Sequence, residues 1–190
     1  MNETEVKNII RRVREGDVNA FAPIVDGYKD IVYTLCIRML VNETDAAEAA
    51  QDIMVKAFRS LKHFQERSKF STWLYRIAYN HCISVIRSKT RIIDLVEEIP
   101  EESGEAPDLS GLGSLSQAER KKYVEEAMES LAETDAVVIT LFYFEELSLE
   151  EIAQVTGLSG GNVRIRLHRA RKKLGEILSG ILSTEIESLL

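Results

Sequence analysis

The chain has 190 residues, 45% of them hydrophobic and 29% charged, with a formal net charge of -7 at pH 7. That length fits one medium domain or two small ones, and no apolar run approaches the ~18 residues that a membrane-spanning helix needs. Because Cys36 and Cys82 form no CxxC pair and the first residues are too polar for a secretory signal, we expect a cytoplasmic protein without membrane contact of its own.

Helical periodicity dominates the first half of the chain. A first helix is predicted over 3–15, ending at Gly16-Asp17. A second is predicted over 20–40, where apolar residues recur near the 3.6-residue period; they are Ile24, Tyr28, Ile31, Leu35 and Met39. A third should begin after Asn42, with Asn42 or Thr44 as its cap, and run to about 64. Its apolar stripe is Ala50, Ile53, Met54, Ala57, Phe58 and Leu61.

The fourth predicted helix begins after Ser68 or Ser71 and contains no Asp or Glu through Arg87. Its expected buried face is Phe70, Trp73, Leu74, Ile77, Ala78, Cys82 and Val85. Tyr75 and Tyr79 lie near the boundary of this face, and the spacing alone does not decide whether they are buried. The opposite side carries Arg76, Asn80, Ser84 and Arg87, which we call the polar stripe.

Charge separates the two halves of the chain. Residues 59–91 and 159–190 are basic, whereas 92–119 contain no Lys or Arg. We therefore predict two helical domains, 1–91 and 118–190, joined by a flexible acidic linker over 92–117. Two basic islands in an acidic chain are the footprint of a phosphate-binding surface, although any single charged run is more often a solvated face.

The second half predicts helices over 117–131 and 134–145, followed by a helix-turn-helix. Ser148 and Glu151 have capping-box spacing, the short helix after them ends at Gly157, and Ser159 caps an arginine-rich helix. In that last helix Val163, Leu167, Ala170, Leu174 and Ile177 share one face. The residues around the remaining surface are Asn162, Arg164, Ile165, Arg166, His168, Arg169, Arg171 and Lys172.

The outward residues of this basic helix suit duplex DNA. Arg164 and Arg169 can each present a bidentate fork to guanine, and Ile165 an apolar contact to a thymine methyl group. Arg171 and Lys172 suit phosphates. The alternative is an amphipathic helix with a solvated basic face, but the capping box, the glycine turn and the buried stripe together favour DNA binding.

The chain resembles the bacterial sigma factors of the extracytoplasmic-function (ECF) group. LSLEEIAQVTGLSGGNVRIRLHRARKKL is similar to their promoter −35-binding domain. DAAEAAQDIMVKAFRSLKHF and FSTWLYRIAYNHCISVIR are similar to the domain that binds RNA polymerase core and melts the −10 element. This resemblance implies an all-α protein of two small helical domains, a four-helix N-terminal domain and a helix-turn-helix C-terminal domain.

The resemblance also assigns roles to residues. It implies that Glu48, Gln51 and Asp52 meet the coiled coil of the largest polymerase subunit. It implies that Arg67 and Lys69, with the polar stripe, contact the opened −10 element. It further implies a promoter partner, both as duplex and as melted single strand, and an anti-sigma factor that covers Glu48, Asp52 and the basic helix.

Two other classes of function compete with a sigma factor. A stand-alone helix-turn-helix regulator would use its N-terminal half to sense a ligand or dimerise, but that half has its own basic helix. An enzyme has little support, because His63, His81 and His168 are scattered and no phosphate loop, HExxH or nucleophile motif is present. We therefore expect no catalytic activity, no cofactor and no metal.

Overall fold

The structure is a computed structural model that describes residues 1–89 and 116–188. Every regular element in these two ranges is helical, as predicted. Contacts divide the chain into two compact units, 1–95 with 150–158 and 96–149 with 159–190. The predicted linker, 92–117, lies outside the described residues except at its last two positions. No helix within the described ranges is long and apolar enough to cross a membrane.

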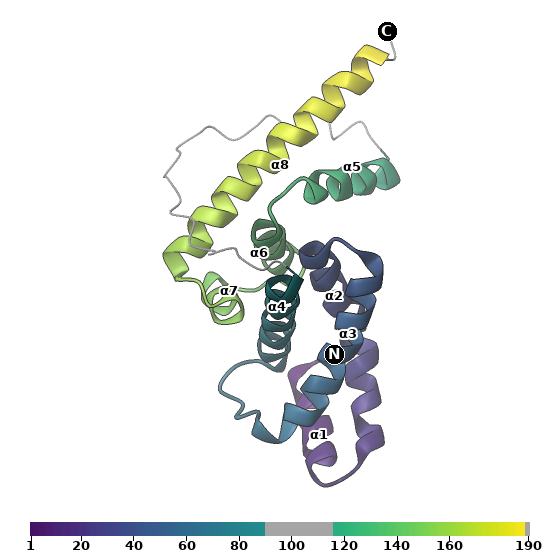
Figure 1. Ribbon diagram of the computed structural model, residues 1–190, viewed down its shortest axis with the longest axis vertical. Helices are drawn as coiled ribbons and strands as arrows, with labels where there is room; N and C mark the ends of the chain where they lie inside the picture. The colour runs from purple at the N-terminus through teal and green to yellow at the C-terminus, as the bar shows by residue number, and fades with distance from the viewer. Residues whose placement is uncertain (90–115, 189–190) are drawn as a thin grey trace. The chain divides into compact units, whose positions relative to one another are not determined.

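The first unit is built on four long helices (Figure 1). These are α1 (Glu3–Arg14), α2 (Ala22–Leu40), α3 (Glu43–Ser60) and α4 (Phe70–Lys89). Two short 3-10 helices, η1 (Val18–Phe21) and η2 (Leu61–His63), precede α2 and follow α3. Both α3 and α4 pack against α2 and against each other. The short α7 (Leu149–Thr156) also falls almost wholly in this unit.

Side-chain caps fix where the helices of the first unit begin. Asn2 and Glu5 form a reciprocal capping box at the start of α1. The predicted cap of α3 is confirmed, because Asn42 Oδ1 accepts a hydrogen bond from the Asp45 backbone N–H at 3.0 Å. The chain leaves α1 through a left-handed Gly16 with φ +105°, a conformation that glycine adopts without a steric penalty.

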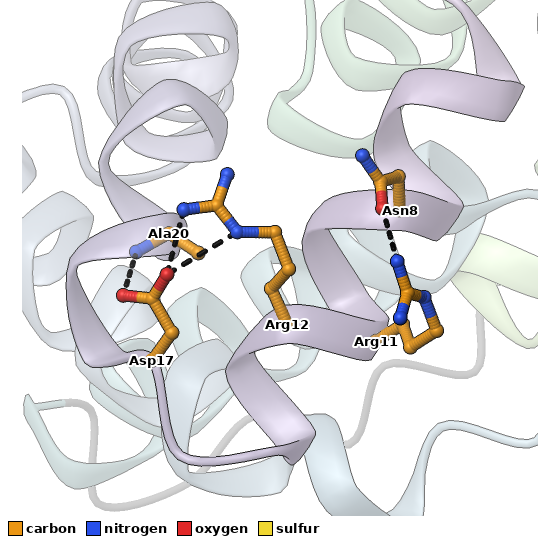
Figure 2. Close-up of polar contacts among 5 residues, drawn as sticks. All are labelled: Asn8, Arg11, Arg12, Asp17 and Ala20. Carbon is orange, nitrogen blue, oxygen red and sulfur yellow. Dashed lines mark hydrogen bonds and ion pairs between the residues drawn. The ribbon is translucent and has the colours of Figure 1, made fainter.

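Polar contacts secure the corner between α1 and η1 (Figure 2). The Arg12 guanidinium donates to Asp17 Oδ2 from Nε at 3.2 Å and from Nη2 at 2.6 Å, while Asp17 Oδ1 accepts from the Ala20 backbone N–H at 3.2 Å. The hydrogen bond from Arg12 is the main cause that lowers the pKa of Asp17. The preceding residue, Arg11, donates to Asn8 Oδ1 at 2.9 Å. Arg11 and Arg12 are therefore held by neighbours in sequence.

The buried face of α4 is rotated relative to the predicted one. Tyr75 and Tyr79, which the sequence left undecided, are only 1% and 8% exposed. Trp73, Ile77 and Val85, expected in the core, are half-buried. The rotation follows from aromatic packing, because Tyr28 of α2 contacts both Tyr75 and Phe70 with ring centroids 6.4 and 5.6 Å apart. In α3, similarly, Ala49 is buried whereas Ala50 and Phe58 of the predicted stripe are half-buried.

The second unit places the long helix α8 (Gly160–Ser188) against α5 (Gln117–Glu129) and α6 (Glu133–Tyr143). Every residue of α6 from Asp135 to Leu141 is buried, so this helix forms the centre of the unit. Val163, Leu167 and Ala170 of the predicted stripe are buried, and Leu174 and Ile177 pack at the edge of a cluster shared with α5. That cluster contains Tyr123, Ala127 and Leu178.

The two cysteines meet inside the first unit. Cys36 of α2 and Cys82 of α4 are both fully buried, with their Sγ atoms 3.7 Å apart. The hydrogen bond from Cys82 and the burial of the thiol raise the pKa of Cys36. A thiol that is both buried and protonated is a poor nucleophile.

We predict that both thiols of the native protein resist Ellman's reagent. Labelling requires opening of the α2–α4 interface, so the rate should be on the order of a thousandfold below that of the chain unfolded in guanidinium. Absorbance at 412 nm measures the rate, and the unfolded chain supplies the total thiol content. Immediate labelling of native protein would contradict the buried placement of these residues.

Candidate functional site

The predicted polymerase-binding residues form an exposed face of α3. Glu48, Gln51 and Asp52 are all exposed, on the side of the helix opposite its buried alanines. Val55, one turn further along, is 46% exposed and extends the same face. Sequence reasoning did not single out Val55. Its signal was an apolar residue that lies outside the buried stripe of its own helix, a position where binding surfaces often place apolar contacts.

A half-buried histidine of α4 lies beside this face. His81 Nε2 is 4.0 Å from Asp52 Oδ2. Burial is the main cause that lowers the pKa of His81, with Lys56 acting in the same direction and Asp52 opposing both. The imidazole is therefore neutral at neutral pH and does not neutralise the exposed Asp52 carboxylate.

The polar stripe of α4 is exposed along its whole length. Arg76, Asn80, Ser84 and Arg87 all face solvent, and Ser84 Oγ donates to the Asn80 carbonyl at 2.8 Å. The burial of Tyr75 and Tyr79 explains this orientation, because residues one position further along a helix point about 100° away. The twenty residues of α4 include no acid. The stripe therefore presents two guanidinium groups, an amide and a hydroxyl without a competing carboxylate on the same helix.

A cavity of about 500 Å³ opens between α1 and the segment before α4. Arg67 and Lys69 both line it, as do the aromatic side chains of Tyr28, Phe64 and Phe70. A cavity of this volume is in the range that accommodates small organic groups. Glu3 and Glu66 also line the cavity, and Lys69 Nζ lies 3.0 Å from Glu151 Oε1. The cationic side chains beside aromatic rings suit a planar group attached to an anionic backbone.

Local geometry at the helix-turn-helix agrees with two of the predicted caps, those at Gly157 and Ser159. Gly157 has φ +75°, the left-handed conformation expected after α7, and Ser159 Oγ accepts from the Asn162 backbone N–H at 3.2 Å. In α8, Asn162, Arg164, His168 and Arg171 are exposed. Ile165 and Lys172 are partly exposed. These six residues, together with Arg169, make up most of the accessible part of the predicted −35 surface.

Arg166 and Arg169 have a further contact that the sequence did not indicate. Asp135 of α6 is only 4% exposed. Its carboxylate accepts from Arg166 Nη1 at 2.8 Å and from Arg169 Nε and Nη2 at 3.1 and 2.8 Å. The side chain of Arg166 is 14% exposed and that of Arg169 is 38% exposed. Both arginines therefore join α8 to α6, and Arg166 is the less accessible of the two.

We predict that Asp135→Asn destabilises the second unit by about 2–3 kcal/mol. The substitution leaves two partly buried guanidinium groups without their carboxylate, a loss reduced by the exposure of Arg169. Hydrogen exchange of the α6 and α8 amides measures the effect. The chain's single tryptophan, Trp73, lies in the first unit and does not report on it. The exposed Glu133→Gln in the same helix is the control, and equal exchange in both variants would contradict the role of Asp135.

Two segments of the chain match family models: residues 24–92 match Sigma-70 region 2, and residues 121–174 match Sigma-70, region 4. The chain is 36% identical over 179 residues to the ECF RNA polymerase sigma factor SigW of Bacillus subtilis, covering 90% of this chain and 96% of that protein. It is 35% identical over 173 residues to the ECF RNA polymerase sigma-E factor of Escherichia coli K12, covering 87% and 90%.

A solved structure supports the fold. The sigma factor RpoE of Bartonella quintana, in complex with the anti-sigma factor NepR, matches with a TM-score of 0.64 at 23% identity. The match covers 85% of this chain and 98% of that one. The two helical parts predicted from the sequence thus occur together in a known protein.

Proposed function

Because the chain belongs to the family of ECF RNA polymerase sigma factors, we propose specific roles for its surfaces in transcription initiation. As an alternative sigma factor it binds RNA polymerase core and recognises promoter DNA. The matches to both sigma regions favour this function over a stand-alone helix-turn-helix regulator. We assign it no catalytic activity of its own and a place of action in the cytoplasm, with the polymerase.

The observation that carries the assignment is the separation of charge within the first unit. The exposed face of α3 carries Glu48 and Asp52, whereas the polar stripe of α4 carries only cationic and neutral groups. An acidic face repels DNA and attracts a basic protein surface. A face with cationic groups and no acids attracts DNA and repels a basic surface. We therefore assign Glu48, Gln51, Asp52 and Val55 to the polymerase.

The polar stripe, with Arg67 and Lys69, is assigned to the opened −10 element. Strand opening requires a protein to bind the unpaired strand better than the duplex. An unstacked base costs a few kcal/mol, which cationic contacts to the backbone and a lined cavity can offset. Arg67, Lys69 and the arginines of the polar stripe supply the cationic contacts, and the cavity lies in the same unit.

The −35 element is assigned to α8. Asn162, Arg164, Ile165 and His168 lie in the first turns after the cap, the part of a recognition helix that reads base edges. Arg171 and Lys172 are assigned to phosphates. Arg166 and Arg169 remain in the proposed DNA surface, but their bonds to Asp135 give them a second role, in orienting α8.

We propose that the sigma regions occupy residues 1–91 and 118–190 and that 92–117 tether them. Core polymerase then holds the two regions at the spacing of the −35 and −10 elements. Once one region has bound its element, the effective concentration of the other region at its own element is high, so the two weak DNA contacts together give tight binding. An anti-sigma factor, as found with the solved relative from Bartonella quintana, would act by covering Glu48, Asp52 and α8.

Reversing the charge of the α3 face tests the polymerase assignment. We expect Glu48→Lys with Asp52→Lys to weaken core binding at least about tenfold, which corresponds to about 1.4 kcal/mol. Fluorescence anisotropy of labelled protein titrated with core polymerase measures the affinity. Glu125→Lys with Glu129→Lys, the same double charge reversal on the exposed surface of α5, is the control for a change of charge alone. Unchanged affinity of the double variant would remove α3 from the interface.

Two arginines of α8 separate base reading from phosphate binding. We expect Arg164→Ala to relax discrimination at one −35 base pair by about 1–3 kcal/mol. Arg171→Ala should instead weaken binding to all sequences alike and lower the salt-dependence slope by about one. Holoenzyme binding to single-substitution −35 duplexes at several salt concentrations measures both effects. The same response from both variants would contradict this division of roles.

A further inference from the structure

Arg14, the last residue of α1, contacts a segment far away in the sequence. Its Nε and Nη2 donate to the Leu61 carbonyl at 3.4 and 3.3 Å, and Nη2 also donates to the Phe64 carbonyl. Its Nη1 lies 3.3 Å from Glu66 Oε1. The Arg14 guanidinium thus binds three acceptors, two backbone carbonyls and one carboxylate, that lie within the six residues 61–66.

The other cations in the last turn of α1 behave differently. Arg11 pairs with Asn8 and Arg12 with Asp17 (Figure 2). Arg11 also pairs with Glu15, so all these partners lie within five residues. Fixing an arginine side chain costs rotamer entropy, so several well-placed acceptors are needed to hold it. The planar fork suits a set of acceptors with fixed geometry, whereas a lysine ammonium has neither the fork nor the same reach.

The segment that Arg14 holds stands directly before Arg67 and Lys69, which we call the −10 loop. Phe64 packs its ring against Phe70 and Trp73, with centroids 5.8 and 5.0 Å apart, at the start of α4. Glu66 has φ +56°, a left-handed conformation that a residue with a side chain rarely adopts. Such a conformation persists only where its surroundings fix it. The Arg14 contacts to Phe64 and Glu66 do so on both sides of Gln65.

The same contacts connect α1 with the cavity. Met1, Glu3 and Lys7 of the α1 region form one wall, and Glu66, Arg67 and Lys69 form another. A shift of the 64–69 backbone would therefore change how Arg67 and Lys69 face this cavity. Ring packing fixes Phe64 from the core side, but of the contacts described here only the Arg14 pair holds the Glu66 side chain.

We propose that Arg14 is a positioning residue for −10 selectivity: it fixes the backbone of Phe64–Glu66 and so sets how Arg67 and Lys69 meet the unpaired strand. The inference rests on the proposed −10 role of this loop. Arg14 itself needs no contact with DNA, because it acts through the backbone that carries the contacting side chains.

Open-complex selection tests the proposal with the full chain and core polymerase. One template pool randomises the −10 hexamer next to a fixed −35 element, and a second randomises the −35 element; opened templates are recovered and sequenced. We expect Arg14→Ala to reduce −10 enrichment about tenfold relative to wild type and to leave −35 enrichment and core affinity unchanged. Arg11→Ala, the same charge change one turn earlier in α1, should behave as wild type in both pools.

Arg14→Lys distinguishes positioning from charge. A lysine retains the positive charge but cannot bridge the three acceptors, so we expect it to lose −10 selectivity as the alanine variant does. Full selectivity with lysine would overturn the proposal in favour of a simple charge contact with DNA. Wild-type selectivity with alanine, or equal losses in both pools, would also overturn it. If the wild-type holoenzyme enriches no −10 sequence at all, the proposed function of the loop fails first, and the proposal with it.

Discussion

The arrangement of the first unit depends on aromatic packing where α2, η2 and α4 meet. Phe64, Phe70 and Trp73 contact one another, and Tyr28 joins Phe70 to Tyr75. Each such ring pair contributes about 0.5–1.5 kcal/mol beyond the burial of its surface. The cluster fixes both the starting point of α4 and its rotation about its own axis. With Tyr75 inside, the polar stripe faces solvent, so the stripe residues assigned to DNA are oriented by a ring that is buried on the same helix.

Charge separation is the second constraint, because this acidic protein binds a polyanion. In the first unit the exposed face of α3 is acidic and α4 carries no acid, whereas Glu3 and Glu66 line the cavity beside Arg67 and Lys69. In the second unit an acid does contact the proposed DNA-binding helix: the buried carboxylate of Asp135 binds two of the arginines of α8. Those bonds neutralise part of the positive charge and fix the helix against α6. Exposed neighbours such as Arg164 and Arg171 keep their charge available for DNA.

Features with local causes could be predicted from the sequence. Apolar spacing predicted the helices and most of the buried stripe of α8, and local hydrogen-bond chemistry predicted the caps at Asn42 and Ser159. Features with partners far along the chain could not. Asp135 looks like an ordinary acid in a first helical turn, and its partners come 31 and 34 residues later. Arg14 likewise reads as a cation that favours a helix C-terminus, although its acceptors lie 47 to 52 residues away.

The burial of Tyr75 and Tyr79 depends both on local helical spacing and on partners far along the chain. A tyrosine at the edge of an apolar stripe can lie with its ring inward or outward, and helical spacing does not decide which. Packing against Tyr28 of another helix decides it for Tyr75. The candidate site was therefore predictable as a set of residue types on the right helices, whereas its cavity and its supporting contacts required the tertiary structure.

The central claim is that this chain gives core RNA polymerase a promoter preference through two separate DNA surfaces. Run-off transcription from a pool of bacterial genomic fragments, with purified core polymerase and with or without the chain, tests it most directly. We expect transcripts that require the chain and whose start sites share two upstream sequence elements at a constant spacing. Duplex binding by the chain alone, without any chain-dependent transcript, would contradict it.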